Sequence, residues 1–572
     1  MRHGKWPGSE MNILVVNLTR FGDLLQSAAA IRSLAEKDGE KAVGPNKIGP
    51  NKIGIVCLEN FAAGAALLPE VDAIFPLPSG KILAALNTLS PGPESRNPGD
   101  SSPEWLNGVK KLHSWIGDIK KSFCPDAVYN ISPTTSSCLL GRLLADEKEY
   151  SGFTIDAFGY RHNANPWATF MQGASVSRSV SPFNIVDIFR KVAGDTGCSP
   201  DASLLPVAPD AVAAMAEKLN EEKPGETRGF VALQLGASAA IRQWPVRFFS
   251  LVGDALWEKH KILPLLLGTR AELSLAEEYA AEATGNYISL IGETDITGLG
   301  AALSLSSLLV SNDTGTLHLG AGIGIPVIGM YLATAQPWDT GPYADGNYSL
   351  EPDIPCHPCE FGNACEHALM CHKTITPETV IGLAEKILSP GTENFPCSEK
   401  FSAYAGTRLW QSTHDEYGFA DLTSLSGHEN TERTQWMRLQ RLVYRQFFDR
   451  NTAAPFVFEP VTNPPRLFNT AAGTMAGSPM ADSLAGECDA VLALFDAILQ
   501  QAAMLAENPL PAIKDRFGRT LHRLNSLLAS TPAFAAISFM WQNEIMTQQS
   551  LDSTIPLMAE YRDLFKSLRN LI

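Results

Sequence analysis

Two stretches of this chain alternate short apolar strands with helical patterns, and this alternation limits the possible folds more than any other feature. In the first stretch, strands are expected at 12–18, 53–58, 73–77 and 127–131. In the second, they are expected at 230–235, 262–267, 287–291, 308–311 and 327–331. Short connections between alternating strands and helices predict parallel sheets with helices on both faces. We therefore predict an α/β protein with two doubly wound domains, at 11–205 and 228–392.

The last part of the chain has a different pattern. Long helical periodicities replace the alternation at 431–450, 487–506, 511–529 and 534–570, which predicts a mostly helical appendage over 400–572. The helix at 431–450 is basic and amphipathic. Two interpretations stay open for it: its apolar stripe docks on a neighbouring domain, which is the commoner use of such a helix, or it lies on an anionic membrane surface. The other helices could pack on the core or mediate self-association.

Charge and targeting signals exclude several classes of protein. The 572 residues carry 45 basic and 61 acidic side chains, a net charge of −16, which argues against a nucleic-acid partner. No apolar run of about 18 residues is free of charges and helix breakers, so no membrane span is expected. Residues 1–10 have no apolar segment typical of a secretory signal. We therefore expect a cytoplasmic protein with mostly reduced thiols.

Ligands of open α/β sheets bind beyond the carboxyl ends of the strands. The first loop in such a position runs from Thr19 to Asp23, between the first strand and its helix. A carboxylate at this point can cap the helix N-terminus. It can also face the cleft as a general base. The residues alone do not separate these two roles for Asp23.

A second loop of this kind, Ser311–Thr316, combines small residues with the start of a helix. Small residues let the backbone approach a ligand, and the free N–H groups and dipole of a helix N-terminus favour an anion such as a pyrophosphate. A plain strand-to-helix turn is the simpler interpretation. Arg242 follows another loop of small residues. It is either a solvated charge or a guanidinium that binds phosphate oxygens.

The order of these motifs resembles the heptosyltransferases of glycosyltransferase family 9. The matching segments are Ile13–Leu34, Leu233–Pro245 and Leu308–Tyr331, within a resemblance that covers about 11–390. Gly22-Asp23 corresponds to the family's acidic motif. Arg242 stands two places before a Trp-Pro pair, where family members often have Lys. The D-T-G-x-x-H motif is present without a gap as Asp313, Thr314, Gly315 and His318.

The resemblance implies a GT-B architecture, in which two Rossmann-like domains face a cleft. It implies an inverting transferase that moves heptose from an ADP-heptose donor onto the inner core of lipopolysaccharide, a lipid-linked glycan. Peripheral association with the cytoplasmic face of the inner membrane would suit such an acceptor. Transfer to a protein acceptor, use of another sugar nucleotide, and a non-catalytic GT-B scaffold that binds partners through its helices are the alternatives.

The resemblance also implies roles for individual residues. Asp23 would remove the proton from the acceptor hydroxyl, and Arg242 would stabilise the leaving diphosphate. No cofactor is needed for this chemistry. The donor and its nucleotide would be held by a further set of residues, of which Arg270 and Glu272 match the family more loosely: Arg270, Glu272, Asp313, Thr314, Gly315, Thr316 and His318.

Four of the ten cysteines stand within sixteen residues, in the pattern C-x2-C-x5-C-x5-C: Cys356, Cys359, Cys365 and Cys371. In a reduced compartment, such a cluster favours a tetrahedral metal site, and sulfur ligands suit zinc or iron. Autotransporter heptosyltransferases look similar in carrying a four-cysteine iron finger near this place. The alternative is a loop of reduced or partly paired thiols. We predict a structural zinc or iron here.

Overall fold

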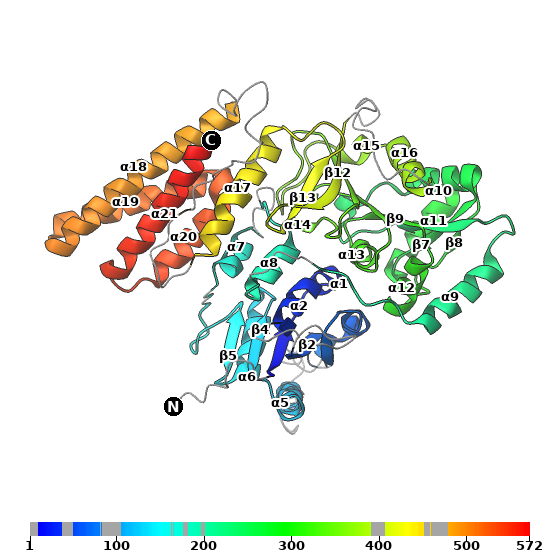
Figure 1. The fold of residues 1–572 in the computed structure, drawn as a ribbon, viewed down its shortest axis with the longest axis horizontal. Coiled ribbons are helices and arrows are strands. Elements are labelled where there is room, and N and C mark those ends of the chain that lie inside the picture. The colour runs from blue at the N-terminus through cyan, green and yellow to red at the C-terminus, as the bar shows by residue number, and fades with distance from the viewer. Residues whose placement is uncertain are drawn as a thin grey trace, which may run out of the picture.

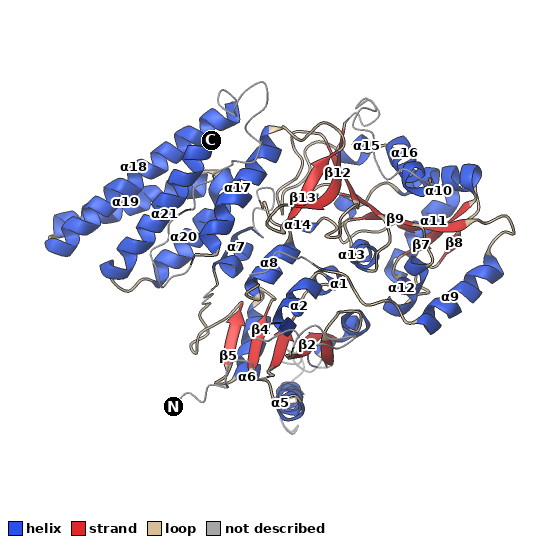
Figure 2. Cartoon of the chain, in the orientation of Figure 1, coloured by secondary structure: helices blue, strands red, loops and turns tan. Residues whose placement is uncertain are grey.

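The computed structural model describes residues 10–36, 50–80, 82, 104–161, 163, 165–174, 181–195, 201–389, 406–450, 458 and 479–572. Figures 1 and 2 show two α/β domains, each built on its own sheet, and a bundle of helices beside them. The sequence repeats Gly-Pro-Asn-Lys-Ile at 44–53 and is rich in proline at 454–482. Both stretches lie largely outside the described residues.

The first domain holds a five-stranded sheet, entirely parallel, in the order β3-β2-β1-β4-β5. Alternate residues of β1 face opposite sides: Ile13 and Val15 pack into one apolar cluster, Leu14 and Val16 into another. Both faces are therefore covered, as predicted. The elements are β1 (Asn12–Val16), α1 (Phe21–Leu25), α2 (Ala28–Glu36), β2 (Lys52–Leu58), α3 (Ala62–Ala65), β3 (Val71–Leu77), α5 (Glu104–Ser122), β4 (Ala127–Asn130), α6 (Thr135–Ala145), β5 (Glu149–Gly152), α7 (Pro166–Ala174) and α8 (Ile185–Val192).

The second domain holds an eight-stranded sheet in the order β13-β12-β11-β10-β9-β6-β7-β8. Its strands from β6 to β11 run parallel. The elements are α9 (Pro209–Glu222), β6 (Gly229–Gln234), α10 (Val246–His260), β7 (Ile262–Leu267), α11 (Leu273–Glu282), β8 (Ile288–Ser289), α12 (Ile296–Ser304), β9 (Leu308–Asn312), α13 (Gly315–Gly322), β10 (Val327–Met330), α14 (Pro337–Thr340), β11 (Tyr348–Pro352), α15 (Cys371–Thr374) and α16 (Pro377–Leu388).

The start of the predicted appendage belongs to this second sheet instead. β12 (Thr407–His414) pairs antiparallel with β11, and β13 (Ala420–Ser424) pairs antiparallel with β12. The expected boundary at 400 is therefore wrong. The apolar pattern concealed these strands because β12 buries polar side chains: Arg408 is 9% exposed and forms ion pairs with Glu351 and Asp353.

The helix α17 (Glu432–Phe448) docks on the α/β domains. Its apolar stripe is buried, with Phe447 fully so, and this confirms the docking interpretation. Two of its arginines are also buried and face carboxylates: Arg438 pairs with Asp421 at 3.2 Å, and Arg441 pairs with the same residue at 2.9 Å. The alternative, that this helix lies on a membrane surface, is wrong because both its apolar and basic groups are occupied inside the protein.

Four further helices form a bundle at one end of the molecule (Figure 1). They are α18 (Pro479–Glu507), α19 (Pro511–Ser530), α20 (Ala535–Thr547) and α21 (Leu551–Leu571). The pattern at 534–570 is two helices, because Ser550 caps a new helix with its side chain. Among the described helices, α18 alone is long and apolar enough to cross a membrane by length and composition, a test that a core helix of a soluble protein also passes. Its Val491, Phe495 and Ile498 are buried in the bundle.

Candidate active site

The two domains meet directly at the predicted site, where α1 of the first domain packs against α13 of the second. Glycines permit this approach. A Cβ atom on Gly315 would lie 2.6 Å from Cδ1 of Phe21 and 3.1 Å from the backbone nitrogen of Gly22. A Cβ atom on Gly22 would lie 2.9 Å from Cδ2 of His318. The acidic loop and the D-T-G-x-x-H motif, almost 300 residues apart in the chain, are therefore one structural unit.

Asp23 lies in the first turn of α1 and faces a pocket between the domains. The N-cap position belongs to Arg20, and no side chain caps this five-residue helix. The capping interpretation therefore does not account for Asp23, although its charge still suits a helix N-terminus. The carboxylate is 20% exposed, and its Oδ2 lies 3.6 Å from Nε of Arg20. It is accessible enough to exchange a proton with a bound hydroxyl.

The pocket that Asp23 faces has a volume of about 250 Å³. One wall is apolar and comes from the first domain: Met171, Phe183, Ile185, Ile188 and Phe189. The second domain contributes Asp339, Thr340 and Phe361. Phe361 belongs to the cysteine-rich loop, so this loop forms part of the pocket wall.

Arg242 is buried beside the same pocket. Its Nε donates a hydrogen bond to Oγ1 of Thr334 at 2.8 Å, and its Nη1 lies 3.6 Å from Oδ2 of Asp313. The guanidinium also lies 5.5 Å from the centre of the Phe361 ring. The interpretation of Arg242 as a solvated surface charge is therefore wrong, since the residue is only 7% exposed. Phe361 connects the two halves of the site, because it contacts Arg242 and lines the pocket of Asp23.

The loop before α13 is held in place by a residue that the sequence motifs did not single out. The side chain of Asn312 is fully buried, and its Nδ2 donates to the carbonyl oxygens of Leu235 at 2.9 Å and Gly236 at 3.1 Å. Its Oδ1 accepts from the backbone N–H of Trp244 at 2.8 Å. Asn312 thus ties the D-T-G loop to the loops on either side of Arg242. Its position directly before Asp313 is the sequence feature that could have identified Asn312 as part of the site.

The N-terminus of α13 offers backbone donors to a ligand. Thr314 occupies the N-cap position without a side-chain hydrogen bond to the helix, its hydroxyl lying 3.2 Å from Oγ of Ser311. Thr316 instead donates its hydroxyl to Oε1 of Gln234 at 2.9 Å, which anchors the helix to β6. An anion would be stabilised at such a helix N-terminus.

His318 is neutral at physiological pH, because burial lowers its pKa to about 4 although the nearby Asp23 acts in the opposite direction. It can therefore donate or accept a hydrogen bond in the cleft without adding a positive charge. Its contact with Gly22 keeps it at the junction of the two domains.

Glu272 and Arg270 lie farther along the edge of the second sheet. Glu272 Oε2 accepts hydrogen bonds from the backbone N–H and the hydroxyl of Thr269, so this carboxylate caps its own helix. A Cβ atom on Gly236 would collide with Oε1 of Glu272, which places the carboxylate directly against the loop that Asn312 holds. Arg270 is exposed. Neither residue lines the pocket of Asp23.

The four clustered cysteines are free thiols that lie between β11 and the first residue of α15. The proximity of Cys356, Cys365 and Cys371 adds to the effect of burial in raising the pKa of the Cys359 thiol. The donor set therefore fits a thiophilic metal. However, no group of three or more Cys, His, Asp or Glu side chains within the described ranges is gathered closely enough to hold an ion. A metal would have to draw these sulfur atoms together.

Comparisons with known proteins agree with the motifs. Residues 160–368 match the model of glycosyltransferase family 9 (heptosyltransferase). The chain is therefore similar to glycosyltransferase family 9 over this middle part of its length. The matched segment includes Arg242 and the D-T-G-x-x-H motif, whereas Asp23 precedes it. The two α/β domains with a pocket between them form the GT-B fold that the resemblance implied.

Two curated heptosyltransferases are similar to this chain over part of its length. Lipopolysaccharide heptosyltransferase 1 of Pseudomonas aeruginosa is 25% identical over 143 residues, which are 25% of this chain and 39% of the relative. Lipooligosaccharide heptosyltransferase 2 of Campylobacter jejuni is 27% identical over 163 residues, 28% of this chain and 50% of the relative. The chain thus spans half or less of the length of these relatives. A solved family 9 structure from Veillonella parvula is 16% identical, covers 67% of this chain and 98% of its own, and gives a TM-score of 0.47.

Proposed function

We propose that this chain is an inverting glycosyltransferase that moves heptose from an ADP-heptose donor to an inner-core lipopolysaccharide acceptor. The observation that carries the proposal is the convergence of Asp23 and Arg242, from different domains, on Phe361, which lines the pocket of Asp23 and contacts Arg242. Asp23 can receive a proton, and Arg242 can stabilise a developing negative charge. Relatives named as heptosyltransferases support the choice of sugar and acceptor.

In the proposed reaction, the acceptor hydroxyl attacks the anomeric carbon from the face opposite the diphosphate. The new bond joins the acceptor oxygen to this carbon, while the bond between the carbon and the diphosphate oxygen breaks. Asp23 takes the hydroxyl proton as general base. Arg242 and the N–H groups of Thr314, Gly315 and Thr316 stabilise the negative charge on the departing ADP.

Further residues would orient the donor. Asp313 and His318 are placed at the junction of the domains to bind sugar hydroxyls or the diphosphate. Glu272 and Arg270 would meet the nucleoside, since Glu272 lies against the Gly236 loop at the edge of the second sheet. The ion pair between Asp313 and Arg242 would also hold the guanidinium in place when no ligand is bound.

The experiment is incubation with ADP- and UDP-sugars, with released nucleotide and acceptor mass as readouts. ADP-heptose with an inner-core acceptor should give ADP and a product heavier by one heptosyl unit. Asp23→Asn should lower turnover about 10²–10⁴-fold, the usual contribution of a general base, while the donor still binds. Asp118→Asn, on the distant helix α5, is the matched control. A fully active Asp23→Asn variant would show that Asp23 is not the general base. If the wild type neither binds nor turns over any sugar nucleotide, the non-catalytic scaffold is the alternative that remains.

A protein acceptor is the second candidate, and the composition of the Asp23 pocket favours it. An acceptor rich in phosphate or carboxylate groups would call for cationic side chains. The described lining instead has eight apolar side chains, two carboxylates and one cation, Arg20, which already faces Asp23. Such a wall suits a neutral or apolar segment that bears a hydroxyl. Mass analysis of peptides after incubation with the donor distinguishes this acceptor from a glycolipid.

We also propose that the cysteine cluster holds one structural zinc or iron ion per chain, bound by Cys356, Cys359, Cys365 and Cys371. The support is the donor chemistry of four neighbouring thiols. Such an ion would fix the loop that carries Phe361 and would take no part in the chemical step. Metal analysis of the purified protein should give about one equivalent. Absence of metal, or the same metal content after replacing two of the cysteines with Ser, contradicts the proposal.

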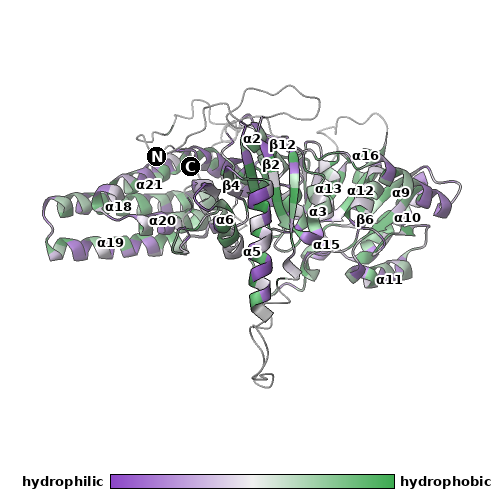
Figure 3. Ribbon diagram, turned by 90° about the horizontal axis from the view of Figure 1, so that it is seen from below, coloured by the Kyte–Doolittle hydropathy of each residue, from purple (hydrophilic) through white to green (hydrophobic). Residues whose placement is uncertain are grey.

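We propose that peripheral membrane association at the cytoplasmic face uses the bundle and not α17. Arg516, Arg519 and Arg523 share one exposed face of α19, and among the described residues no carboxylate pairs with them. Figure 3 shows hydrophilic segments along this helix at the edge of the bundle. Basic residues of this kind bind anionic lipid surfaces. Co-sedimentation with anionic vesicles, compared with neutral ones, tests this, and loss of binding is expected when all three become Gln.

A further inference from the structure

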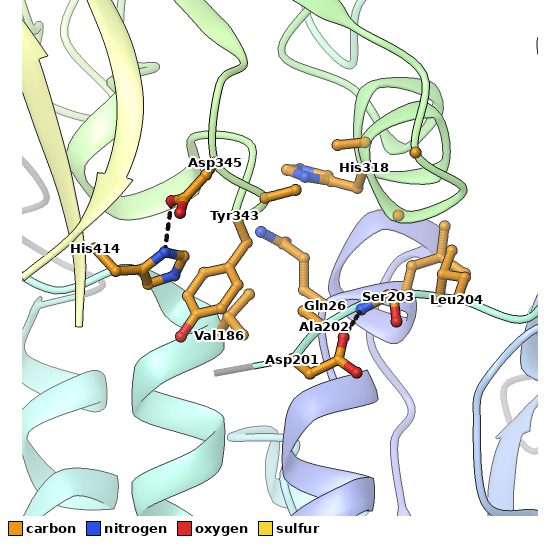
Figure 4. Close-up of a pocket in the computed structure, with 15 residues that line it drawn as sticks. Gln26, Val186, Asp201, Ala202, Ser203, Leu204, His318, Tyr343, Asp345 and His414 are labelled. Carbon is orange, nitrogen blue, oxygen red and sulfur yellow. Dashed lines mark hydrogen bonds and ion pairs between the residues drawn. The ribbon is translucent and has the colours of Figure 1, made fainter. Parts of the chain in front are cut away.

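A second cavity lies on the other side of the contact between α1 and α13 (Figure 4). Its volume is about 390 Å³, and both domains line it. The first domain contributes Gln26, which follows α1, and Val186 of α8. The second contributes His318, Tyr343, Asp345 and His414. Asp23 is not among the lining residues, so this cavity is distinct from the pocket of the proposed base.

Gln26 is the feature of this cavity that the fold does not explain. The residue is 5% exposed, yet neither Nε2 nor Oε1 of its amide has a hydrogen-bond partner in the described structure. In Figure 4 the amide end points into the space between His318 and Tyr343. A buried amide without partners costs free energy, so natural proteins rarely keep one that has no use. The side chain is therefore available to a molecule inside the cavity.

A second side chain of this cavity, His414, also has a buried polar atom without a hydrogen-bond partner. His414 Nδ1 lies 2.7 Å from Oδ1 of Asp345, which favours a proton on Nδ1. Its Nε2 is buried and has no partner, which leaves it as a hydrogen-bond acceptor. The cavity thus presents one amide donor and two acceptors, Oε1 of Gln26 and Nε2 of His414, contributed by the two domains.

The charges around the cavity restrict the ligand. Its described lining includes the carboxylates of Asp201 and Asp345 and no lysine or arginine, and burial keeps the nearby His318 neutral. An anion such as a phosphate would find no cationic partner among these lining residues. A molecule with several uncharged hydroxyl groups can donate to the two acceptors and accept from the amide, and a monosaccharide fits the volume. Val186, Leu204 and Ala321 supply apolar surface for its C–H groups.

We propose that this cavity is a binding site for a neutral sugar, held by Gln26 from the first domain and His414 from the second. Since the ligand contacts both domains, its binding favours the domain arrangement described above. His318, which we propose orients the donor, also lines this cavity. The proposal does not rest on the proposed catalytic function, however, because it concerns binding by Gln26 and His414 at a site that Asp23 does not line.

The test uses the full chain and a neutral monosaccharide such as D-mannose, with D-mannose 6-phosphate as the charged comparison. Titration calorimetry should show saturable binding of the neutral sugar and weaker binding of D-mannose 6-phosphate. Thermal unfolding should show a higher unfolding temperature when the neutral sugar is bound. Gln26→Leu should weaken binding at least ten-fold, because two hydrogen bonds are lost. His414→Phe should weaken it several-fold.

Folding of the key variant is not a concern, since replacing an unpartnered buried amide with an apolar side chain of similar shape is neutral or stabilising. Gln501→Leu is the matched control: it removes another buried amide, from the distant helix α18, and should leave sugar binding unchanged. Asp23→Asn should also bind the sugar as the wild type does. Lack of saturable binding by the wild type, equal binding by Gln26→Leu, or tighter binding of the phosphate would overturn the proposal.

Discussion

At the scale of single residues, the site depends on a histidine that burial keeps neutral. The pKa of His318 in the folded chain is lowered to about 4, mainly by burial, from an ordinary value near 6.5. The unfolded chain therefore binds a proton first as the pH falls. Between about pH 6.5 and pH 4 this difference favours unfolding, whereas above pH 6.5 it contributes nothing.

We therefore predict that acid destabilises the chain partly through His318. Between pH 7 and pH 5 the wild type should lose roughly 1–2 kcal/mol more of its free energy of unfolding than His318→Gln, which cannot take up this proton. Urea unfolding at both pH values measures the difference. His113→Gln is the control, because this histidine is exposed on α5 and does not line the site. Equal acid sensitivity of wild type and His318→Gln would contradict this account.

At the scale of elements, the contact between α1 and α13 sets the geometry of the site. A methyl group on Gly315 would meet the Phe21 ring at 2.6 Å and the backbone of Gly22 at 3.1 Å. We predict that Gly315→Ala forces the two helices apart and lowers the rate of transfer at least ten-fold, since small displacements of catalytic groups are costly. Steady-state kinetics measure the rate, and circular dichroism shows that the fold is retained.

The control for this prediction is Gly382→Ala in α16. A Cβ atom there meets nothing within 4 Å, so the substitution should leave the rate unchanged and stabilise the helix by about 0.5–1 kcal/mol. If Gly315→Ala behaves like Gly382→Ala, the close approach of the domains does not control activity.

Much of this element-level organisation could be predicted from the sequence. The strand at 262–267 and the motif-bearing loops were found because apolar β-strands and small-residue turns leave local patterns. The contact of Gly22 with His318 could not be found in this way, since it joins loops almost 300 residues apart. β12 was missed because its buried Arg408 is paired with carboxylates outside this strand. Tertiary partners, unlike periodicity, leave no local signal.

At the scale of the whole molecule, a buried polar network fixes how the domains sit together. Asp187, in α8 of the first domain, is fully buried and accepts hydrogen bonds from the hydroxyl of Tyr343 at 2.6 Å and the backbone N–H of Ala420 at 2.9 Å. Its neighbour Arg190 donates to the carbonyl oxygen of Gly418 at 2.9 Å. Through these contacts, the hairpin of β12 and β13 connects the second sheet to the first domain.

We predict that Asp187→Ala destabilises the chain by about 3–5 kcal/mol, because it leaves the charge of Arg190 buried with one carboxylate partner fewer. Tyr343→Phe removes one hydroxyl from the same network and should cost only about 1–2 kcal/mol. Calorimetric unfolding of the two variants measures both effects. A loss for Asp187→Ala no larger than that for Tyr343→Phe would mean that the domains are held by apolar packing, such as the stacking of Trp167 on Phe419 at 5.8 Å, and not by this polar network.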